Sequence, residues 1–146
     1  MAVSEPHRLG QTLMLVARDF QRRLDTDLAN RGISGIRHRH NDVFLHLGHH
    51  GPSRSVDLAQ AAGIRPQSMT KIIDELEEQG LLQRKPDPHD SRAKLVDFTR
   101  EGRKLIDDLS ESTARVWHEY QSLLGKAELK RTTANLETLI AAGEKA

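Results

Sequence analysis

The sequence predicts a mainly α-helical domain that carries one small β-hairpin. Apolar residues recur at helical spacing over most of the chain, which indicates amphipathic helices. Two short helical segments are joined by Gly-Ile-Arg-Pro, and a turn rich in proline and aspartate joins two short alternating runs. With 146 residues, the chain has the length of one ordinary domain and could bury a single core.

Two amphipathic helices are predicted in the first 50 residues. The first, near residues 8–30, ends before two glycines and carries an apolar stripe formed by Leu9, Leu13, Val16, Phe20, Leu24 and Leu28. The second, roughly residues 37–48, carries Val43, Phe44 and Leu47, and the segment from Gly48 to Pro52 ends it.

Two short helices follow. The first comes after Ser55 and ends at Gly63, where a left-handed cap is expected. The second begins at Pro66, whose missing N–H costs nothing in a first turn, and it ends at Gly80. Its apolar face consists of Met69, Ile72, Ile73 and Leu76. This arrangement is the helix-turn-helix pattern.

The rest of the chain predicts a hairpin and two more helices. Strands at residues 81–85 and 93–98 flank the turn PDPHDSR, and Thr99 is placed to cap a long helix that lasts until Gly125. A last helix carries Leu129, Leu136 and Ile140. The terminal helices hold more apolar surface than a small core needs, so we expect them to form a dimer interface; a closed monomeric bundle is the alternative.

Composition excludes several classes of protein. The 22 basic and 21 acidic residues give a net charge of +1, which by itself indicates no polyanionic partner. The absence of cysteine excludes disulfides, thiolate chemistry and Cys-ligated zinc. No apolar run approaches the roughly 20 residues that span a bilayer, and no signal peptide is visible, so we expect a cytoplasmic protein without a membrane partner.

The second short helix has a polar outer face whose charge changes along its length. The leading end is polar and basic, with Arg65, Gln67, Ser68, Thr70 and Lys71, and the trailing end is acidic, with Asp74, Glu75, Glu77 and Glu78. A helix that enters a major groove by its N-terminal end needs cations and short donors there and acids away from the DNA. The alternative is an ordinary solvated helix face.

The hairpin is rich in cations. Arg84 and Lys85 precede the turn, and Arg92 and Lys94 follow it. A hairpin with arginine near its tip, beside a helix-turn-helix, could enter a minor groove, where negative potential is concentrated. The alternative is a surface hairpin whose charges keep an edge strand from aggregating.

The run DLAQAAGIRPQSMTKIIDELEEQGLLQRKPDPHDSRAKLVDFTREG resembles the multiple-antibiotic-resistance regulator (MarR) family of winged helix-turn-helix proteins. The resemblance includes the motif Asp90-x-Arg92 and, through the terminal helices, covers nearly the whole chain. It implies one domain over residues 1–146, with dimerisation helices at about 1–35 and 105–146 and a DNA-binding lobe at about 36–104.

The same resemblance implies a homodimeric transcriptional regulator that binds a pseudo-palindromic operator in double-stranded DNA. Arg92 would reach the minor groove, with Arg84 and Lys94 in support, and Asp90 would orient the wing. The family pattern implies a repressor that a small anionic aromatic effector releases. The candidate effector residues are Arg18, Arg22, His38, His40 and Phe44.

Three other interpretations stay open at the level of sequence. A zinc-responsive regulator could use histidines of the N-terminal half, such as His46 and His50 at positions i and i+4, although we assign no metal ligand. A constitutive regulator would bind no effector, and a helical interaction protein would bind no DNA. No catalytic constellation or phosphate-cradling loop is present, so we expect no enzymatic activity and no cofactor.

Overall fold

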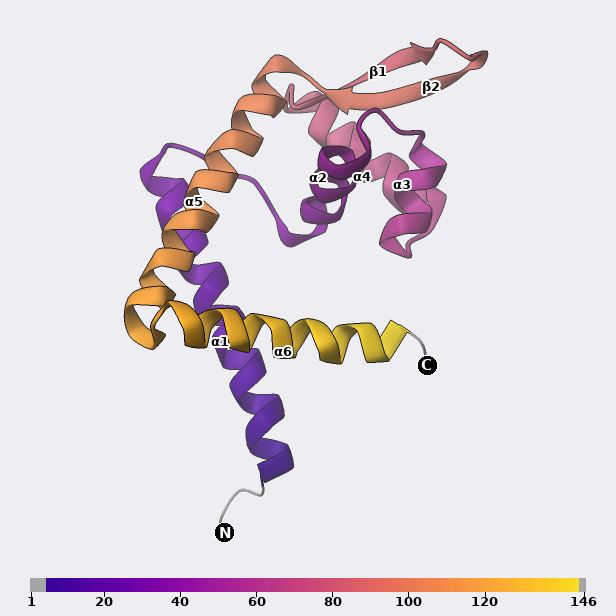
Figure 1. Cartoon of the computed structure of the whole chain (residues 1–146). Coiled ribbons are helices and arrows are strands. Elements are labelled where there is room, and N and C mark those ends of the chain that lie inside the picture. Colours follow the sequence, from indigo (N-terminus) through magenta and orange to yellow (C-terminus); the bar gives the residue numbers. More distant parts are fainter. Residues whose placement is uncertain (1–4, 145–146) are drawn as a thin grey trace. The chain divides into compact units, whose positions relative to one another are not determined.

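The computed structural model of the protein describes residues 5–144, apart from the side chains of His38 and Glu144. It confirms a mainly helical chain with one antiparallel hairpin (Figure 1). The elements, in order, are α1 (Glu5–Asn30), α2 (His38–His50), α3 (Ser55–Ala62), α4 (Pro66–Glu78), β1 (Leu82–Asp87), β2 (Asp90–Phe98), α5 (Arg100–Leu124) and α6 (Lys126–Glu144).

The chain divides into two compact units. The central unit is Gly32–Leu109, and the terminal unit combines the chain up to Arg31 with the chain from Ser110 onward. The central unit therefore holds the helix-turn-helix, the hairpin and the first turns of α5. The terminal unit holds α1, the rest of α5, and α6.

The helices lie where the sequence predicts them, with small shifts at their ends. Gly48 stays inside α2, which ends instead at Gly51, a residue with a φ of 74°. Ser55 is the first residue of α3 and does not precede it; Arg54 occupies the cap position. The predicted left-handed cap at Gly63 is confirmed by a φ of 67° and a ψ of 30°.

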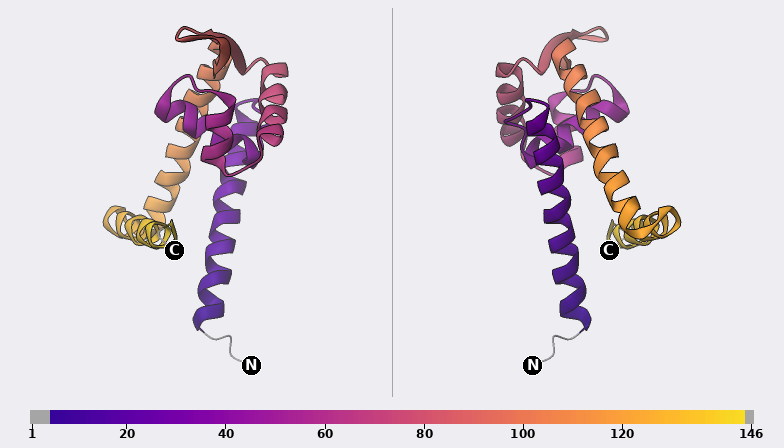
Figure 2. Two further views of the ribbon diagram at one scale, coloured as in Figure 1. Left: turned by 90° about the vertical axis from the view of Figure 1, so that its right-hand side faces the viewer. Right: turned by 90° about the vertical axis from the view of Figure 1, so that its left-hand side faces the viewer.

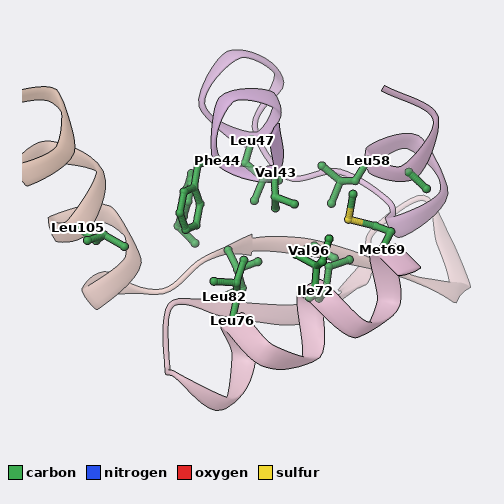
Figure 3. Packing of buried hydrophobic residues seen from close by; sticks show 13 residues of the cluster. Val43, Phe44, Leu47, Leu58, Met69, Ile72, Leu76, Leu82, Val96 and Leu105 are labelled. Atoms are coloured by element: carbon green, nitrogen blue, oxygen red, sulfur yellow. The ribbon is translucent and has the colours of Figure 1, made fainter. Parts of the chain in front are cut away.

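The core of the central unit lies between α4 and the helices and strands that cover its inner face. The four apolar residues predicted for this face of α4 are all buried, and the side chains of Ile73 and Leu76 have no exposed surface. Residues of α2, α3, α4, both strands and α5 point into this layer (Figure 3). The inner face of α4 is therefore fixed, which leaves the opposite face in solvent.

The hairpin is longer, and its turn tighter, than the sequence predicts. The strands extend to Asp87 and from Asp90, and they include the turn residue Pro86, which pairs with Lys94. Both strands of a two-stranded sheet are edge strands, and an edge strand tolerates a proline. The hairpin lies at one edge of the central unit, with α2, α3 and α4 on the same side of it (Figures 1 and 2).

The base of the hairpin is tied to the segment before α3. The Ser53 N–H donates to the Val96 carbonyl oxygen at 3.0 Å, and the Val96 N–H donates to the Ser53 carbonyl oxygen at 2.8 Å. A two-stranded hairpin is marginally stable by itself, so this additional pairing supports β2.

The terminal unit contains a buried carboxylate. Asp27 of α1 is 7% exposed and accepts a hydrogen bond from Ser112 of α5 at 2.6 Å. Arg31 at 2.9 Å and Arg115 at 3.1 Å supply positive charge. The Ser112 hydrogen bond and then the Arg31 hydrogen bond hold the pKa of Asp27 below its ordinary value. Asp27 thus joins α1 to α5 as a satisfied ion.

The start of α5 packs closely on the chain that leaves α4. The side chain of Thr99 caps α5, as predicted, by accepting the Gly102 N–H at 3.0 Å. A methyl group at Gly102 would lie 2.0 Å from the carbonyl oxygen of Leu81 and 3.2 Å from the Phe98 ring. This helix position therefore requires a glycine.

Substitution of this glycine should destabilise the protein. We expect Gly102→Ala to lower the free energy of unfolding by about 1–3 kcal/mol, because the backbone of Leu81 must move. Gly48→Ala is the matched control: a methyl group there meets no atom within 4 Å, so the variant should gain about 0.5–1 kcal/mol. Urea denaturation measures both variants. Equal stabilities for the two would contradict the close packing at Gly102.

Candidate nucleic-acid interface

The leading end of α4 presents a polar, basic surface. The residues that the sequence predicts to read DNA are all exposed: Arg65, Gln67, Ser68, Thr70 and Lys71. The side chain of the N-cap residue, Arg65, makes no capping hydrogen bond, so the first-turn N–H groups of α4 stay available to an acceptor. Such an end, with its positive dipole, favours an anion such as a phosphate.

Three of the four acidic residues at the trailing end of α4 are paired with cations from other elements. Arg84 of β1 donates to Asp74 at 2.7 Å and to Glu77 at 2.8 Å, and Arg39 of α2 donates to Glu75 at 2.8 Å. Among the residues that the structure describes, the ion pairs of α4 all involve these acids and none involves its two leading cations. Positive charge is therefore left at one end of the helix only.

These pairs change the position expected for Arg84. The sequence places it beside the hairpin turn as a cation that supports a minor-groove contact. In the structure its side chain is 25% exposed and lies against α4. Arg84 therefore joins α4 to the hairpin through its ion pairs. The spacing of residues along the chain does not predict this contact.

The tip of the hairpin contains an irregularity that carries Arg92. Pro86 pairs with Lys94, but the next residue, Asp87, pairs with Asp90, so residues 91–93 of β2 have no partner on β1. A bulge of this kind directs side chains away from the regular ladder. Arg92 and Lys94 are both exposed.

Two aspartates shape this tip. Asp90 accepts the Arg92 N–H at 3.0 Å through its side chain, and so it contacts the backbone of the residue that the sequence predicts to enter the minor groove. Asp87 is 8% exposed and accepts the His89 N–H at 2.9 Å and the Arg54 guanidinium at 2.8 Å. These contacts, with the His89 hydrogen bond foremost, lower the pKa of Asp87.

Sequence reasoning missed Asp87 and Arg54. The two residues are 33 positions apart, and no periodicity joins them. The only local signal was the Asp-Pro pair of the turn, because an aspartate there readily accepts an N–H two residues further on.

The candidate effector residues belong to both units of the chain. Phe44, expected to be a pocket wall, is 5% exposed and belongs to the central core, with its ring centroid 6.1 Å from that of Phe98. Arg18 and Arg22 lie on α1 in the terminal unit, where they line a shallow surface hollow, and Arg22 pairs with Asp19. The side chain of His38 lies outside the described part of the chain.

His40, another candidate effector residue, is buried between α2 and α4. It is 1% exposed, its Nδ1 accepts the Arg37 N–H at 3.1 Å, and its Nε2 lies 3.5 Å from Glu75. Burial lowers the pKa of His40, although Glu75 acts in the opposite direction. His40 therefore links the start of α2 to α4 in its neutral form.

The half-buried His46 and the exposed His50 lie one helical turn apart on α2. The rings of His46 and His50 stack with centroids 4.3 Å apart. Within the described residues, no group of three or more His, Cys, Asp or Glu side chains could hold a metal ion. In that same part of the chain, every helix is too short or too polar to cross a membrane.

Comparison with known proteins finds a family model that matches the central part of the chain. Residues 34–93 match the model of the MarR family. A transcriptional regulator from Thermotoga maritima is 25% identical, with a TM-score of 0.61 over 94% of this chain and 95% of that chain.

Two more distant structures share the fold. A protein from Mycobacterium tuberculosis is 20% identical, with a TM-score of 0.78 over 98% of this chain and 97% of its own. Wild-type MarR from E. coli in its apo form is 19% identical, with a TM-score of 0.68 over 95% and 98% of the two chains. The fold is thus the winged helix-turn-helix that the sequence predicts.

The buried histidine predicts a dependence of stability on pH. Because the pKa of His40 is lowered in the folded protein, its contribution to stability is present above about pH 6.5 and is lost as the pH falls through the lowered value. We expect His40→Asn, which keeps an acceptor near Nδ1, to show a smaller loss of unfolding free energy between about pH 7 and pH 5.5.

Urea denaturation at the two pH values measures this difference. His49→Asn is the matched control, because His49 is exposed on the same helix, and it should retain the loss seen in the wild type. An unchanged loss in the His40 variant would show that another group causes it.

Proposed function

We propose that the chain is a transcriptional regulator of the MarR family, whose model its residues 34–93 match, and that it binds operator DNA as a homodimer. In this proposal α4 enters the major groove by its leading end, and the tip of the hairpin meets the adjacent minor groove. The observation that carries the proposal is the distribution of charge. Three of the four trailing acids of α4, Asp74, Glu75 and Glu77, are paired within the protein, whereas the leading cations of α4 and those of the hairpin tip remain exposed.

In the major groove, the exposed leading end of α4 would supply both kinds of contact. Arg65 and Lys71 can meet phosphates or guanine edges, and Gln67 can pair with adenine. Ser68 is a short donor, and the Thr70 hydroxyl, which donates to the Pro66 carbonyl oxygen at 3.0 Å, can accept a hydrogen bond; both short side chains allow the helix backbone to approach the DNA. The first-turn N–H groups of α4 would add a phosphate contact.

In the minor groove, Arg92 would make the main contact. Its place in the bulge and its exposure support this role, and Asp90 would hold its backbone. Lys94 would add a phosphate contact nearby. We assign Arg84 a supporting role through α4, because its guanidinium is engaged by Asp74 and Glu77.

Homodimerisation is supported by the apolar stripe of α1. Leu28, near the end of the stripe, is 5% exposed, but Leu9 and Val16 at its start are 56% and 50% exposed. Further apolar side chains are exposed on α6, where Leu139 is 59% and Ile140 is 64% exposed. Covering these surfaces with a second copy would remove the apolar area from water. The two copies of α4, about 34 Å apart, would then match the two half-sites of a pseudo-palindromic operator.

We further propose that the protein acts as a repressor, because a dimer bound over a promoter excludes polymerase without catalytic groups. Release by an anionic aromatic effector is the finer part of this proposal. Its support is the pair of exposed arginines on α1, Arg18 and Arg22, since His40 and Phe44 are buried in the central core.

The minor-groove contact can be tested with Arg92→Ala. Selection from random duplex DNA would provide an operator, and titration at fixed salt would provide the dissociation constant. We expect the variant to fold normally and to bind about 5- to 150-fold more weakly, which corresponds to about 1–3 kcal/mol. The control Lys104→Ala removes one exposed charge from α5 of the same unit and should change affinity little. Equal affinities for Arg92→Ala and wild type would rule out the wing contact, and failure to select any sequence would rule out specific DNA binding.

The dimer can be tested with a charge in the exposed part of the α1 stripe. We expect Val16→Glu to shift the protein toward monomer at micromolar concentration, because the interface would bury an unpaired carboxylate. Sedimentation equilibrium measures the mass. Gln11→Glu, an exposed substitution of similar shape on the other side of α1, should leave the dimer intact. A wild-type protein that sediments as a monomer would refute the proposal that a homodimer binds two half-sites.

A further inference from the structure

We propose that Arg54 is a positioning residue that fixes the tip of the hairpin and thereby the place of Arg92. The part of this inference that concerns DNA rests on the function proposed above. Arg54 precedes α3 and belongs to neither strand of the hairpin. Its guanidinium nevertheless contacts both aspartates that shape the tip.

The tip needs support from outside the strands. Beyond the pair of Pro86 with Lys94, the backbone ladder is interrupted, and residues 91–93 have no partner on β1. A two-stranded hairpin has little stability of its own, and an interrupted one has fewer cross-strand bonds. The conformation of the tip therefore depends on side-chain contacts.

Arg54 supplies those contacts through two aspartates. Its Nη2 lies 2.8 Å and its Nε 3.2 Å from Asp87 Oδ2, and the same Nη2 lies 3.7 Å from Asp90 Oδ2. Asp87 in turn accepts the N–H of His89, and Asp90 accepts the N–H of Arg92. A single guanidinium thus holds the two carboxylates that bind the backbone of the turn and of the bulge. Without it, two carboxylates with no shared cation would repel each other.

The backbone of Arg54 is itself anchored. Its carbonyl oxygen accepts the N–H groups of Asp57 and Leu58, both at 3.1 Å, and Leu58 is 1% exposed in the core. The preceding residue, Ser53, pairs with Val96 at the base of β2. The segment of residues 53–54 therefore holds the hairpin at its base and at its tip. This segment therefore fixes the position of the tip relative to the helix-turn-helix.

A direct contact between Arg54 and a DNA phosphate is the competing explanation. The two roles differ in salt dependence. Loss of one phosphate contact lowers the slope of log affinity against log salt by about one. Arg54 already shares its charge with two carboxylates, so a positioning residue would change affinity while leaving this slope nearly constant.

The test compares Arg54→Gln, Asp87→Asn and the double variant with the wild type. Lys85→Gln is the matched control, because it also removes one cation from an ion pair of the hairpin, but at Asp97, away from the tip. Amide hydrogen exchange in the DNA-free protein reports on the tip, with the amides of Ile73 and Leu76 as an internal reference for the fold. Titration of the selected operator at several salt concentrations reports on binding.

In the DNA-free protein, we expect Arg54→Gln to speed exchange at His89 and Arg92 about fivefold or more relative to the reference amides, because opening of the tip becomes easier. Lys85→Gln should leave both amides unchanged. On the operator, Arg54→Gln should weaken binding at least about fivefold with a salt slope changed by less than about 0.5. Asp87→Asn should add little in the Arg54→Gln background, because both act through one contact.

Unchanged exchange at His89 and Arg92 in Arg54→Gln would overturn the proposal, whatever happens to DNA binding. A slope lower by about one, with unchanged exchange, would identify a phosphate contact instead. Faster exchange in a protein that binds no selected DNA in any form would support the positioning of the tip while refuting the proposed function. The two failures are thus distinguishable.

Discussion

Burial of the apolar face of α4 against the hairpin and its neighbouring helices is the constraint on which the rest of the central unit depends. A helix turns by about 100° per residue, so fixing Ile73 and Leu76 in the core also fixes which residues face outward. The same packing brings the trailing end of α4 beside β1, where Arg84 meets Asp74 and Glu77. The position of the polar outer face of α4 and the distribution of charge along it both follow from this burial.

Pairing of charges would allow a nearly neutral chain to bind DNA as proposed. Across the whole sequence 22 cations oppose 21 acids, and a uniform surface of that kind would attract DNA weakly. In the central unit, acids of α4 and of the hairpin are held by Arg39, Arg54 and Arg84. These paired acids do not neutralise the exposed cations at the leading end of α4 and at the hairpin tip. In the proposed complex, contacts from these two places would depend on the position of the DNA, which would favour correctly docked DNA.

In the terminal unit, the apolar stripe of α1 is buried at one end and exposed at the other. Near its end the stripe is covered within the unit, where Leu28 is buried and Asp27 is held by Ser112. Toward its start the same stripe is exposed at Leu9 and Val16. A buried ion with its partners in place costs little but permits few alternative packings, so α1 and α5 are held in one register. An apolar surface that continues from a covered region into an exposed one is what a second copy could extend over.

The sequence by itself determined the elements and their inner faces, because both depend on spacing over a few residues. The apolar face of α4, the left-handed cap at Gly63 and the capping of α5 by Thr99 follow from patterns within one or two turns. The exposure of the polar residues on the outer face of α4 follows from the same periodicity. Only the tertiary structure decided which polar residues meet across the chain. Arg54 and Asp87 are 33 positions apart, His40 and Glu75 are 35 apart, and no local pattern encodes either contact. The sequence pattern likewise did not predict the burial of Phe44 and His40, which we had assigned to an effector site, or the contact of Arg84 with α4. Packing places a side chain according to its neighbours in space.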